Sequence, residues 1–400
     1  MGGTQYILAG GLIDGSGAGV LRDVFMAVQD SIITAIGPAT DQPRPKQAEF
    51  VDLSHCVILP PLVDCSVSLM HSPSVDWQVR LAAEHADPMA RAAMLERHLS
   101  YCHVYGVLGV VANDDLDDLL AKERMAGAPG SVIDLRFAGP LCRTRQDCVA
   151  GPLLGRDFLK IDYTGNIEDQ EPPNLRFNLK DLGRMLRNQG GKMAVVVVAN
   201  GQQQVAEALA AGCDAIEQGY GMGEANLRMM AAKKVLWIPS VLRAKNGLDG
   251  VSSGGEVCCR FSQRYVAPGK PNPGAEAYWK KTLAEQLSQL RLARKLGVTT
   301  AVGTGAGSVG ILHGESMAEE MKLFMKAGYS LAETIRCASE NGARFFGMKK
   351  LGILAAGRPA TFLITRGSLQ QLPRKLSYLE GIYIDGAPSS TYHKNPVKTG

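Results

Sequence analysis

Residues 57–68 read Val57-Ile58-Leu59-Pro60-Pro61-Leu62-Val63-Asp64-Cys65-Ser66-Val67-Ser68, a hydrophobic run that ends in alternating polar residues. Side chains of a β-strand alternate between its two faces. Asp64, Ser66 and Ser68 therefore share one face, whereas Cys65 and Val67 share the other. We expect one strand over 57–68, with its polar face toward the interior of a barrel.

Short apolar strands alternate with amphipathic helices through the middle of the chain. Val205, Ala208 and Leu209 follow helical spacing, as do Trp279, Leu283, Leu287 and Leu290. Strands separated by helices indicate parallel pairing with crossover helices. We therefore predict a distorted (β/α)8 TIM barrel over residues 57–346, with strands near 57–68, 108–112, 134–139, 158–163, 193–199, 214–217, 235–241 and 298–304.

Both ends of the chain carry short strand patterns with Gly and Pro turns. Residues 24–28 and 32–36 flank an Asp30-Ser31 turn, and similar patterns return at 352–357, 360–365 and 381–384. We expect a small composite β-sandwich domain built from both termini, residues 1–56 and 347–400.

Two local signals concern helix starts and a long loop. Ser316 with Glu319 and Ser330 with Glu333 both have the spacing of a capping box. The stretch 244–274 is rich in Gly, Ser and Pro, and we interpret it as a long loop that is either a lid or surface padding.

Composition places the chain among ordinary globular proteins. Its 400 residues are 46% hydrophobic and 20% charged, with a net charge of +4 and no basic block, which argues against nucleic-acid binding. No apolar run is long enough to span a membrane. Nine scattered cysteines and an N-terminus without signal-peptide features favour a cytoplasmic protein.

Several stretches, in order along roughly residues 7–366, resemble the amidohydrolase superfamily, and most closely its imidazolonepropionase-like and prolidase-like branch. Residues 57–68 resemble the family's first barrel strand, which ends in Asp-x-His-x-His. The other matching stretches are Asp14-Gly15-Ser16-Gly17, Phe158-Leu159-Lys160-Ile161, Val195-Val196-Val197-Val198-Ala199-Asn200-Gly201, Asp214-Ala215-Ile216-Glu217-Gln218-Gly219, Gly303-Thr304-Gly305-Ala306-Gly307 and Gly352-Ile353-Leu354-Ala355-Ala356-Gly357.

The resemblance implies a hydrolase of carbon–nitrogen bonds in amides or cyclic amides that uses one or two divalent metals, normally zinc. Such metals lower the pKa of a bound water and polarise the scissile carbonyl. In this chain the ligand positions hold neutral or apolar residues, which are poor zinc ligands. We therefore predict no metal and no cofactor at the degenerate positions Ser66, Ser68, Val198, Gln218 and Gly305.

Lys160 stands at the position that the resemblance assigns to a metal-bridging lysine. A lysine near a barrel's centre must be paired or lose its proton, and Asp64 on the inward face of the first strand is the expected partner. Two alternatives stay open: a structural Lys160–Asp64 ion pair, or a catalytic pair in which Lys160 binds an acidic ligand or acts as a base or nucleophile.

Other candidate ligand-binding residues follow the predicted strands. His71 and His313 lie where loops leave the first and eighth strands, and a site rebuilt from them with Glu315 is one alternative. Tyr163, Tyr220 and Arg243 follow further strands. They either line the barrel mouth or are surface residues.

Three functional hypotheses follow. In the first, the chain is a degenerate, metal-free amidohydrolase that binds a small molecule or a partner chain, with a homo-oligomer as an open alternative. In the second, it is an active hydrolase of carbon–nitrogen bonds with a site rebuilt around Lys160 and Asp64. In the third, it is a structural subunit of a mixed oligomer.

Overall fold

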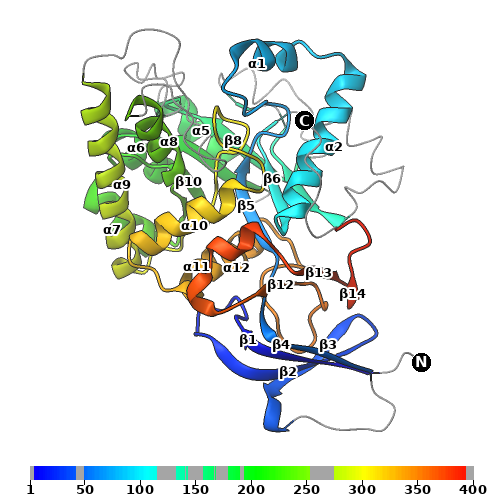
Figure 1. The fold of residues 1–400 in the computed structure, drawn as a ribbon. Coiled ribbons are helices and arrows are strands. Elements are labelled where there is room, and N and C mark those ends of the chain that lie inside the picture. Colours follow the sequence, from blue (N-terminus) through cyan, green and yellow to red (C-terminus); the bar gives the residue numbers. More distant parts are fainter. Residues whose placement is uncertain are drawn as a thin grey trace.

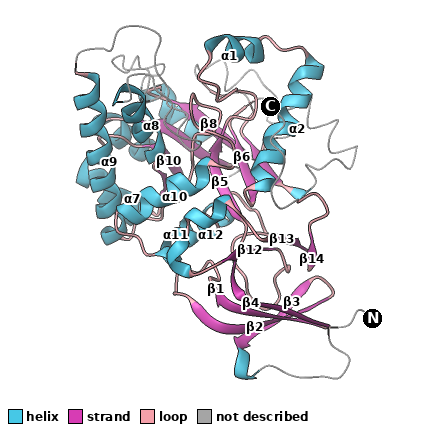
Figure 2. Ribbon diagram, viewed as in Figure 1, coloured by secondary structure: helices cyan, strands magenta, loops and turns pink. Residues whose placement is uncertain are grey.

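The computed structural model describes residues 4–41, 49–114, 132–139, 141–142, 156–165, 167, 179–189, 193–252 and 274–392. Figure 1 shows two parts: a barrel surrounded by helices, and a separate sheet in which strands from both ends of the chain lie side by side. Figure 2 shows that most helices belong to the barrel part.

Seven strands of the barrel are parallel and form two sheets. One has the order β5-β6-β7 and the other has the order β11-β10-β9-β8. The strands are β5 (Leu62–Val67), β6 (Val107–Ala112), β7 (Asp134–Phe137), β8 (Phe158–Asp162), β9 (Ala194–Ala199), β10 (Ala215–Gln218) and β11 (Leu236–Ile238).

The two sheets are joined at both edges. At one edge, the segment 299–306 lies between β11 and β5: the Ala301 N–H donates to Trp237 O, and the Cys65 N–H donates to Val302 O, each at 2.9 Å. At the other edge, the N–H of Asp157, just before β8, donates to Phe137 O of β7 at 3.0 Å. The predicted distorted (β/α)8 barrel is thereby confirmed, although the eighth strand expected at 298–304 makes only isolated bridges.

The helices match the predicted apolar stripes, because the stripe residues of α6 and α9 are buried. The predicted loop 244–274 begins later than expected, since α8 continues to Ser252; residues 253–273 lie outside the described residues. The helices are α1 (Trp77–Glu84), α2 (Pro88–Val104), α5 (Leu179–Gln189), α6 (Gln202–Ala211), α7 (Gly223–Lys233), α8 (Val241–Ser252), α9 (Ala275–Leu296), α10 (Ser316–Lys326), α11 (Leu331–Cys337) and α12 (Glu340–Phe345).

One of the two predicted capping boxes is confirmed. Ser330 caps α11, and its side chain and that of Glu333 exchange hydrogen bonds with each other's backbone amides. The other prediction was wrong, because Ser316 lies inside α10 and its hydroxyl accepts from the Leu312 N–H instead. The spacing alone does not show where the helix begins.

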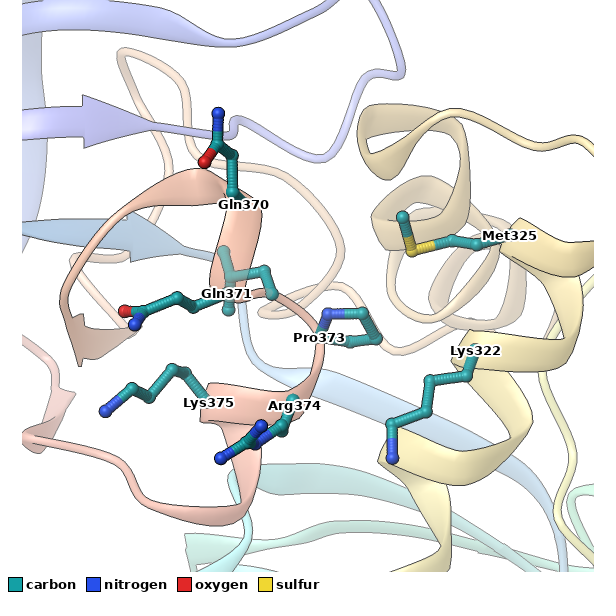
Figure 3. Close-up of a pocket in the computed structure, with 8 residues that line it drawn as sticks. Lys322, Met325, Gln370, Gln371, Pro373, Arg374 and Lys375 are labelled. Carbon is teal, nitrogen blue, oxygen red and sulfur yellow. The ribbon is translucent and has the colours of Figure 1, made fainter.

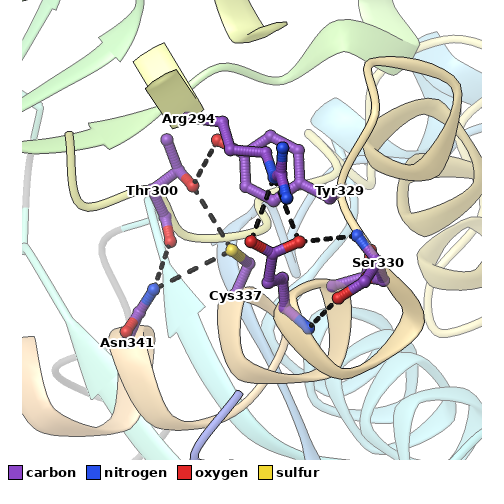
Figure 4. Close-up of polar contacts among 8 residues, drawn as sticks. Arg294, Thr300, Tyr329, Ser330, Cys337 and Asn341 are labelled. Atoms are coloured by element: carbon purple, nitrogen blue, oxygen red, sulfur yellow. Dashed lines mark hydrogen bonds and ion pairs between the residues drawn. The ribbon is translucent and has the colours of Figure 1, made fainter. Parts of the chain in front are cut away.

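A polar cluster around Thr300 binds the segment 299–306 to α11, α12 and the turn before them (Figure 4). The Thr300 hydroxyl contacts the Tyr329 hydroxyl at 3.2 Å and Cys337 Sγ at 3.3 Å, and the Asn341 amide donates to Thr300 O at 2.8 Å. Arg294 of α9 pairs with Glu333 at 3.0 Å. These contacts hold the segment that joins the two barrel sheets.

The terminal domain is a seven-stranded sheet with the order β14-β13-β12-β4-β1-β2-β3. It curls around an apolar core, so that Ile32 at its edge bridges to Pro359, just before β12. This arrangement confirms a small β domain built from both termini. The strands are β1 (Gln5–Leu12), β2 (Leu21–Gln29), β3 (Ile32–Pro38), β4 (Glu49–Leu59), β12 (Phe362–Arg366), β13 (Gly381–Ile384) and β14 (Ala387–Pro388).

The single strand expected over 57–68 is two strands. Residues 57–59 end β4 in the terminal sheet, and β5 starts the barrel at Leu62. Pro60 and Pro61 stand between them and lack the N–H groups that a continuous ladder requires. The chain therefore changes sheets at these prolines, three residues later than the expected boundary.

Among the described residues, no helix is long and apolar enough to cross a membrane.

Candidate functional site

Lys160 lies in a buried polar cluster inside the barrel. Its ammonium donates to Glu217 Oε2 at 2.5 Å and to Asn113 Oδ1 at 2.8 Å. The other Glu217 oxygen accepts from the Ser66 hydroxyl at 2.9 Å. Burial lowers the pKa of Lys160, and the Glu217 carboxylate opposes this shift. The cluster therefore joins β5, β8 and β10 through one shared carboxylate.

The expected Lys160–Asp64 pair was wrong, because Asp64 binds the segment that closes the barrel. Thr304 donates to it through its backbone N–H at 2.9 Å and through its hydroxyl at 2.6 Å. Burial raises the pKa of Asp64 to about 6. Asp64 thus holds β5 to residues 303–306, and the ion pair of Lys160 is made with Glu217.

Glu217 is the important residue that sequence reasoning missed. It lies in the quoted Ile216-Glu217-Gln218 stretch, within a strand that is otherwise apolar up to that point. A carboxylate in a buried strand requires a partner. This requirement could have identified Glu217 from the sequence as a candidate partner of Lys160. The register places Glu217 opposite Val198, which is itself opposite Asp162 on the Lys160 strand.

Arg243 fills the space in front of Gly305. A Cβ atom built on Gly305 would lie 2.6 Å from Arg243 Nε, and Gly305 has a φ of +74°. Arg243 lies in the first turn of α8 and is buried. Two backbone amides of the same turn donate to Glu320 at 2.6 and 2.8 Å. The guanidinium thus occupies the place from which a side chain at position 305 would project.

Gln218 and Val198 contribute no available ligand atom. The Gln218 side-chain oxygen accepts from the Ile167 N–H and from the Asn200 amide, each at 3.0 Å. Val198 is buried in β9 and carries no donor atom. Gln218 therefore ties the loop after β8 to the end of β9.

Ser68 lies between the imidazole of His71 and the carboxylate of Asp114 at the end of β5. Its hydroxyl lies 2.8 Å from His71 Nδ1 and donates to Asp114 Oδ1 at 2.8 Å. Asp114 also accepts from the backbone amides of Leu69 and Met70. Asp114 was not among the predicted site residues. Its position just after the apolar strand at 108–112 could have indicated a residue at the barrel mouth.

His313 reaches the same turn from the other side of the mouth. Its Nε2 lies 2.9 Å from Ser68 O, and its ring stacks on His98 with centroids 3.8 Å apart. Glu315 instead accepts from the Tyr105 hydroxyl at 3.1 Å. The structure therefore brings His71 and His313 to Ser68 but directs Glu315 to Tyr105, so these three residues do not assemble into one ligand set.

The stacked imidazoles predict a stability that depends on pH. Burial lowers the pKa of His313 to about 3, against 6.5 for an ordinary histidine. The unfolded chain therefore binds this proton more readily, so the contribution is complete above pH 6.5 and is lost as pH falls toward 3. We expect wild type to lose about 2 kcal/mol more than His313→Phe between pH 7 and pH 5.

The measurement is urea unfolding of both proteins at each pH. Groups away from this stack titrate alike in both proteins, so the difference between them reports on His313 and on the His98 ring stacked against it. One such group is Glu320, whose pKa burial raises to about 8, so that its contribution has the opposite sign. Parallel pH curves for the two proteins would contradict a neutral, buried His313.

The two predicted tyrosines are buried and bonded to other protein groups. The Tyr163 hydroxyl donates to Glu207 at 2.5 Å, and the Tyr220 hydroxyl donates to Ser240 O at 2.7 Å. Burial raises the pKa of Tyr163. Both hydroxyls therefore connect β-strand ends to neighbouring helices and loops.

The comparisons with known proteins agree with this fold. The sequence model of the amidohydrolase family matches residues 177–391. The chain belongs to the amidohydrolase family. No curated protein sequence matches the chain.

Solved structures similar to this amidohydrolase-family chain extend over almost its full length. A Xaa-Pro dipeptidase with bound methionine has 19% identity and a TM-score of 0.76, covering 96% of this chain and 99% of its own. The A. niger ochratoxinase has 17% identity and a TM-score of 0.75, with coverages of 96% and 95%. Molinate hydrolase has 15% identity and a TM-score of 0.72, with coverages of 98% and 95%. At these identities the likeness establishes the fold.

The donor set of this family member does not fit the divalent metal that the family normally carries. Ser66 already donates to Glu217, and Lys160 occupies the remaining oxygen of that carboxylate. Arg243 fills the space at position 305 with a second cation. In the described part of the chain, no three His, Cys, Asp or Glu side chains are grouped to hold a metal.

A pocket of about 460 Å³ lies away from this cluster, between α10 and the turns η4 (Leu369–Gln371) and η5 (Arg374–Ser377). Figure 3 shows the charged ends of Arg374 and Lys375 pointing away from Lys322. The cations do not converge, so this pocket offers no focused anion site. It is lined by Lys322, Met325, Gln370, Gln371, Leu372, Pro373, Arg374 and Lys375.

Proposed function

We propose that this amidohydrolase-family chain binds a small molecule at its barrel mouth and does not carry out metal-dependent hydrolysis. The observation that carries the proposal is the pair of cations near the former ligand positions. The Lys160 ammonium is bound to Glu217, and the Arg243 guanidinium lies against Gly305. A divalent metal placed among these groups would be repelled by both of them.

Retained charge inside the barrel supports a binding function over a purely structural one. Burying charged groups costs free energy, and apolar side chains of similar volume often give a more stable core. A barrel that served only as a support would have no need of so many ionisable groups. The buried ones here are Asp64, Lys160, Asp162, Glu217, Arg243 and Glu320.

Amide compounds are the proposed ligand class, and an Xaa-Pro dipeptide is the first probe. One similar structure is that of an Xaa-Pro dipeptidase, and shared ancestry favours a ligand of related shape. The catalytic alternative built on Lys160 and Asp64 is not favoured, because Asp64 is bound to Thr304. We also propose a cytoplasmic location, since no disulfide joins the buried cysteines of the described residues.

The test is metal content by elemental analysis, on protein purified without chelator or nickel affinity resin and then dialysed against zinc. We expect almost no metal per chain, and no release of free proline from an Xaa-Pro dipeptide with or without zinc. The Ser66→Ala variant is the control, and it should behave like the wild type.

An equivalent of zinc per chain, or zinc-dependent release of proline, would overturn the proposal. Zinc that binds wild type but not Ser66→Ala would also locate the site at the end of β5. Calorimetric titration with the same dipeptide tests the proposed binding of a small molecule. We expect Arg243→Gln to weaken that binding.

A further inference from the structure

A serine with a neighbouring base lies at the barrel mouth, apart from the Lys160 cluster. Ser68 follows the last residue of β5, at the carboxyl end of the strand where active sites of such barrels lie. Its hydroxyl is 2.8 Å from His71 Nδ1, within the distance of an activated nucleophile and its base. Ser68 is only partly buried and His71 is exposed, so a substrate can reach both.

The backbone of Ser68 is fixed on both sides. Its N–H donates to Ala306 O at 2.8 Å, and its carbonyl oxygen contacts His313 Nε2 at 2.9 Å. Asp114 holds the following turn by accepting from Leu69 and Met70. A nucleophile held in one position avoids part of the entropic cost of reaction.

We propose that Ser68 is an acyl-accepting nucleophile, with His71 as its base, that reacts with esters at the barrel mouth. Ser68 Oγ attacks the carbonyl carbon. Its single proton, which is donated to Asp114 Oδ1 in the structure, turns to His71 Nδ1 and is taken up there. The bond from that carbon to the leaving ester oxygen then breaks, and the leaving alcohol takes the proton from His71. Water, deprotonated by His71, hydrolyses the ester on Ser68 and restores both side chains.

His71 is assigned as the base because its Nδ1 lies 2.8 Å from Ser68 Oγ and its side chain is exposed, whereas Asp114 is buried. Asp114 accepts a hydrogen bond from the Ser68 hydroxyl and interacts with His71 through its charge, so the order of contacts differs from that of a Ser-His-Asp triad. The proposal is independent of the metal question, because Ser68, His71 and Asp114 belong to a different set of contacts from Lys160 and Glu217.

The test is labelling of the full-length protein by an alkyl fluorophosphonate, followed by peptide mass spectrometry. Ser68 Oγ would form a bond to phosphorus while fluoride leaves, and the mass shift locates the label. We expect Ser68 to be labelled, and we expect His71→Ala to slow labelling about 100-fold, the scale of a general base. Because His71 is exposed, this variant should fold normally.

Ser72→Ala is the matched control, since Ser72 lies on the same turn, and it should leave the labelling rate unchanged. Label elsewhere but not on Ser68, or an equal rate in His71→Ala, would overturn the proposal. Labelling is measured with and without zinc, so its outcome is separate from that of the metal measurement.

Discussion

Replacing Glu217 with glutamine is expected to lower the free energy of unfolding by about 3–5 kcal/mol, the cost of breaking a buried ion pair. Glutamine keeps the shape of the side chain but removes the charge that lies 2.5 Å from the Lys160 ammonium. The Lys160 side chain is only 4% exposed, so water cannot replace the carboxylate. Urea unfolding at pH 7, followed by circular dichroism, gives the difference.

The control is a double-mutant cycle with Lys160→Met. Combining Lys160→Met with Glu217→Gln removes both charges, so the double variant should be much more stable than the sum of the two single losses implies. Losses that add, or a Glu217→Gln loss below about 1 kcal/mol, would show that the pair is not the buried contact described here.

Gly307→Ala is expected to lower the free energy of unfolding by about 3–4 kcal/mol, from backbone strain and overpacking together. Gly307 has a φ of +91°, which a residue with a Cβ adopts at a cost. Its added Cβ would lie 2.3 Å from the Ser68 carbonyl oxygen and 2.9 Å from Ser68 Cβ. Neither atom is the end of a flexible side chain, so the strand itself must move.

Gly297→Ala separates the two causes. Gly297 has a φ of +74° but open space around its Cβ position, so its substitution should cost only the conformational part, about 1 kcal/mol. Thermal and urea unfolding of both variants give the comparison. Equal losses at the two positions would argue against the close approach of residue 307 to β5.

The sequence predicts the barrel well because its signal is local. Apolar spacing in α6 and α9 reports which face of each helix is buried, and short apolar runs separated by helices imply parallel strands. The change of sheet at Pro60–Pro61 was missed because the apolar run continues on both sides of it. Hydrophobicity does not distinguish one buried strand from two.

The site was predictable only in part. The residue types at the five positions that the resemblance assigns to metal ligands are visible from the sequence alone. The partners are not, because Lys160 and Glu217 are 57 residues apart and Asp64 and Thr304 are 240 apart. Two carboxylates were available to one lysine, and only the register of the strands decides which of them faces it.

The position of Arg243 against Gly305 couples these two residues in any substitution. A side chain at position 305 would place its first carbon 2.6 Å from Arg243 Nε, on a backbone with a φ of +74°. Gly305→Asp alone therefore requires the Arg243 side chain to move and the backbone to hold a conformation that glycine adopts more readily. A second substitution, at Arg243, removes the first of these two obstacles and leaves the second.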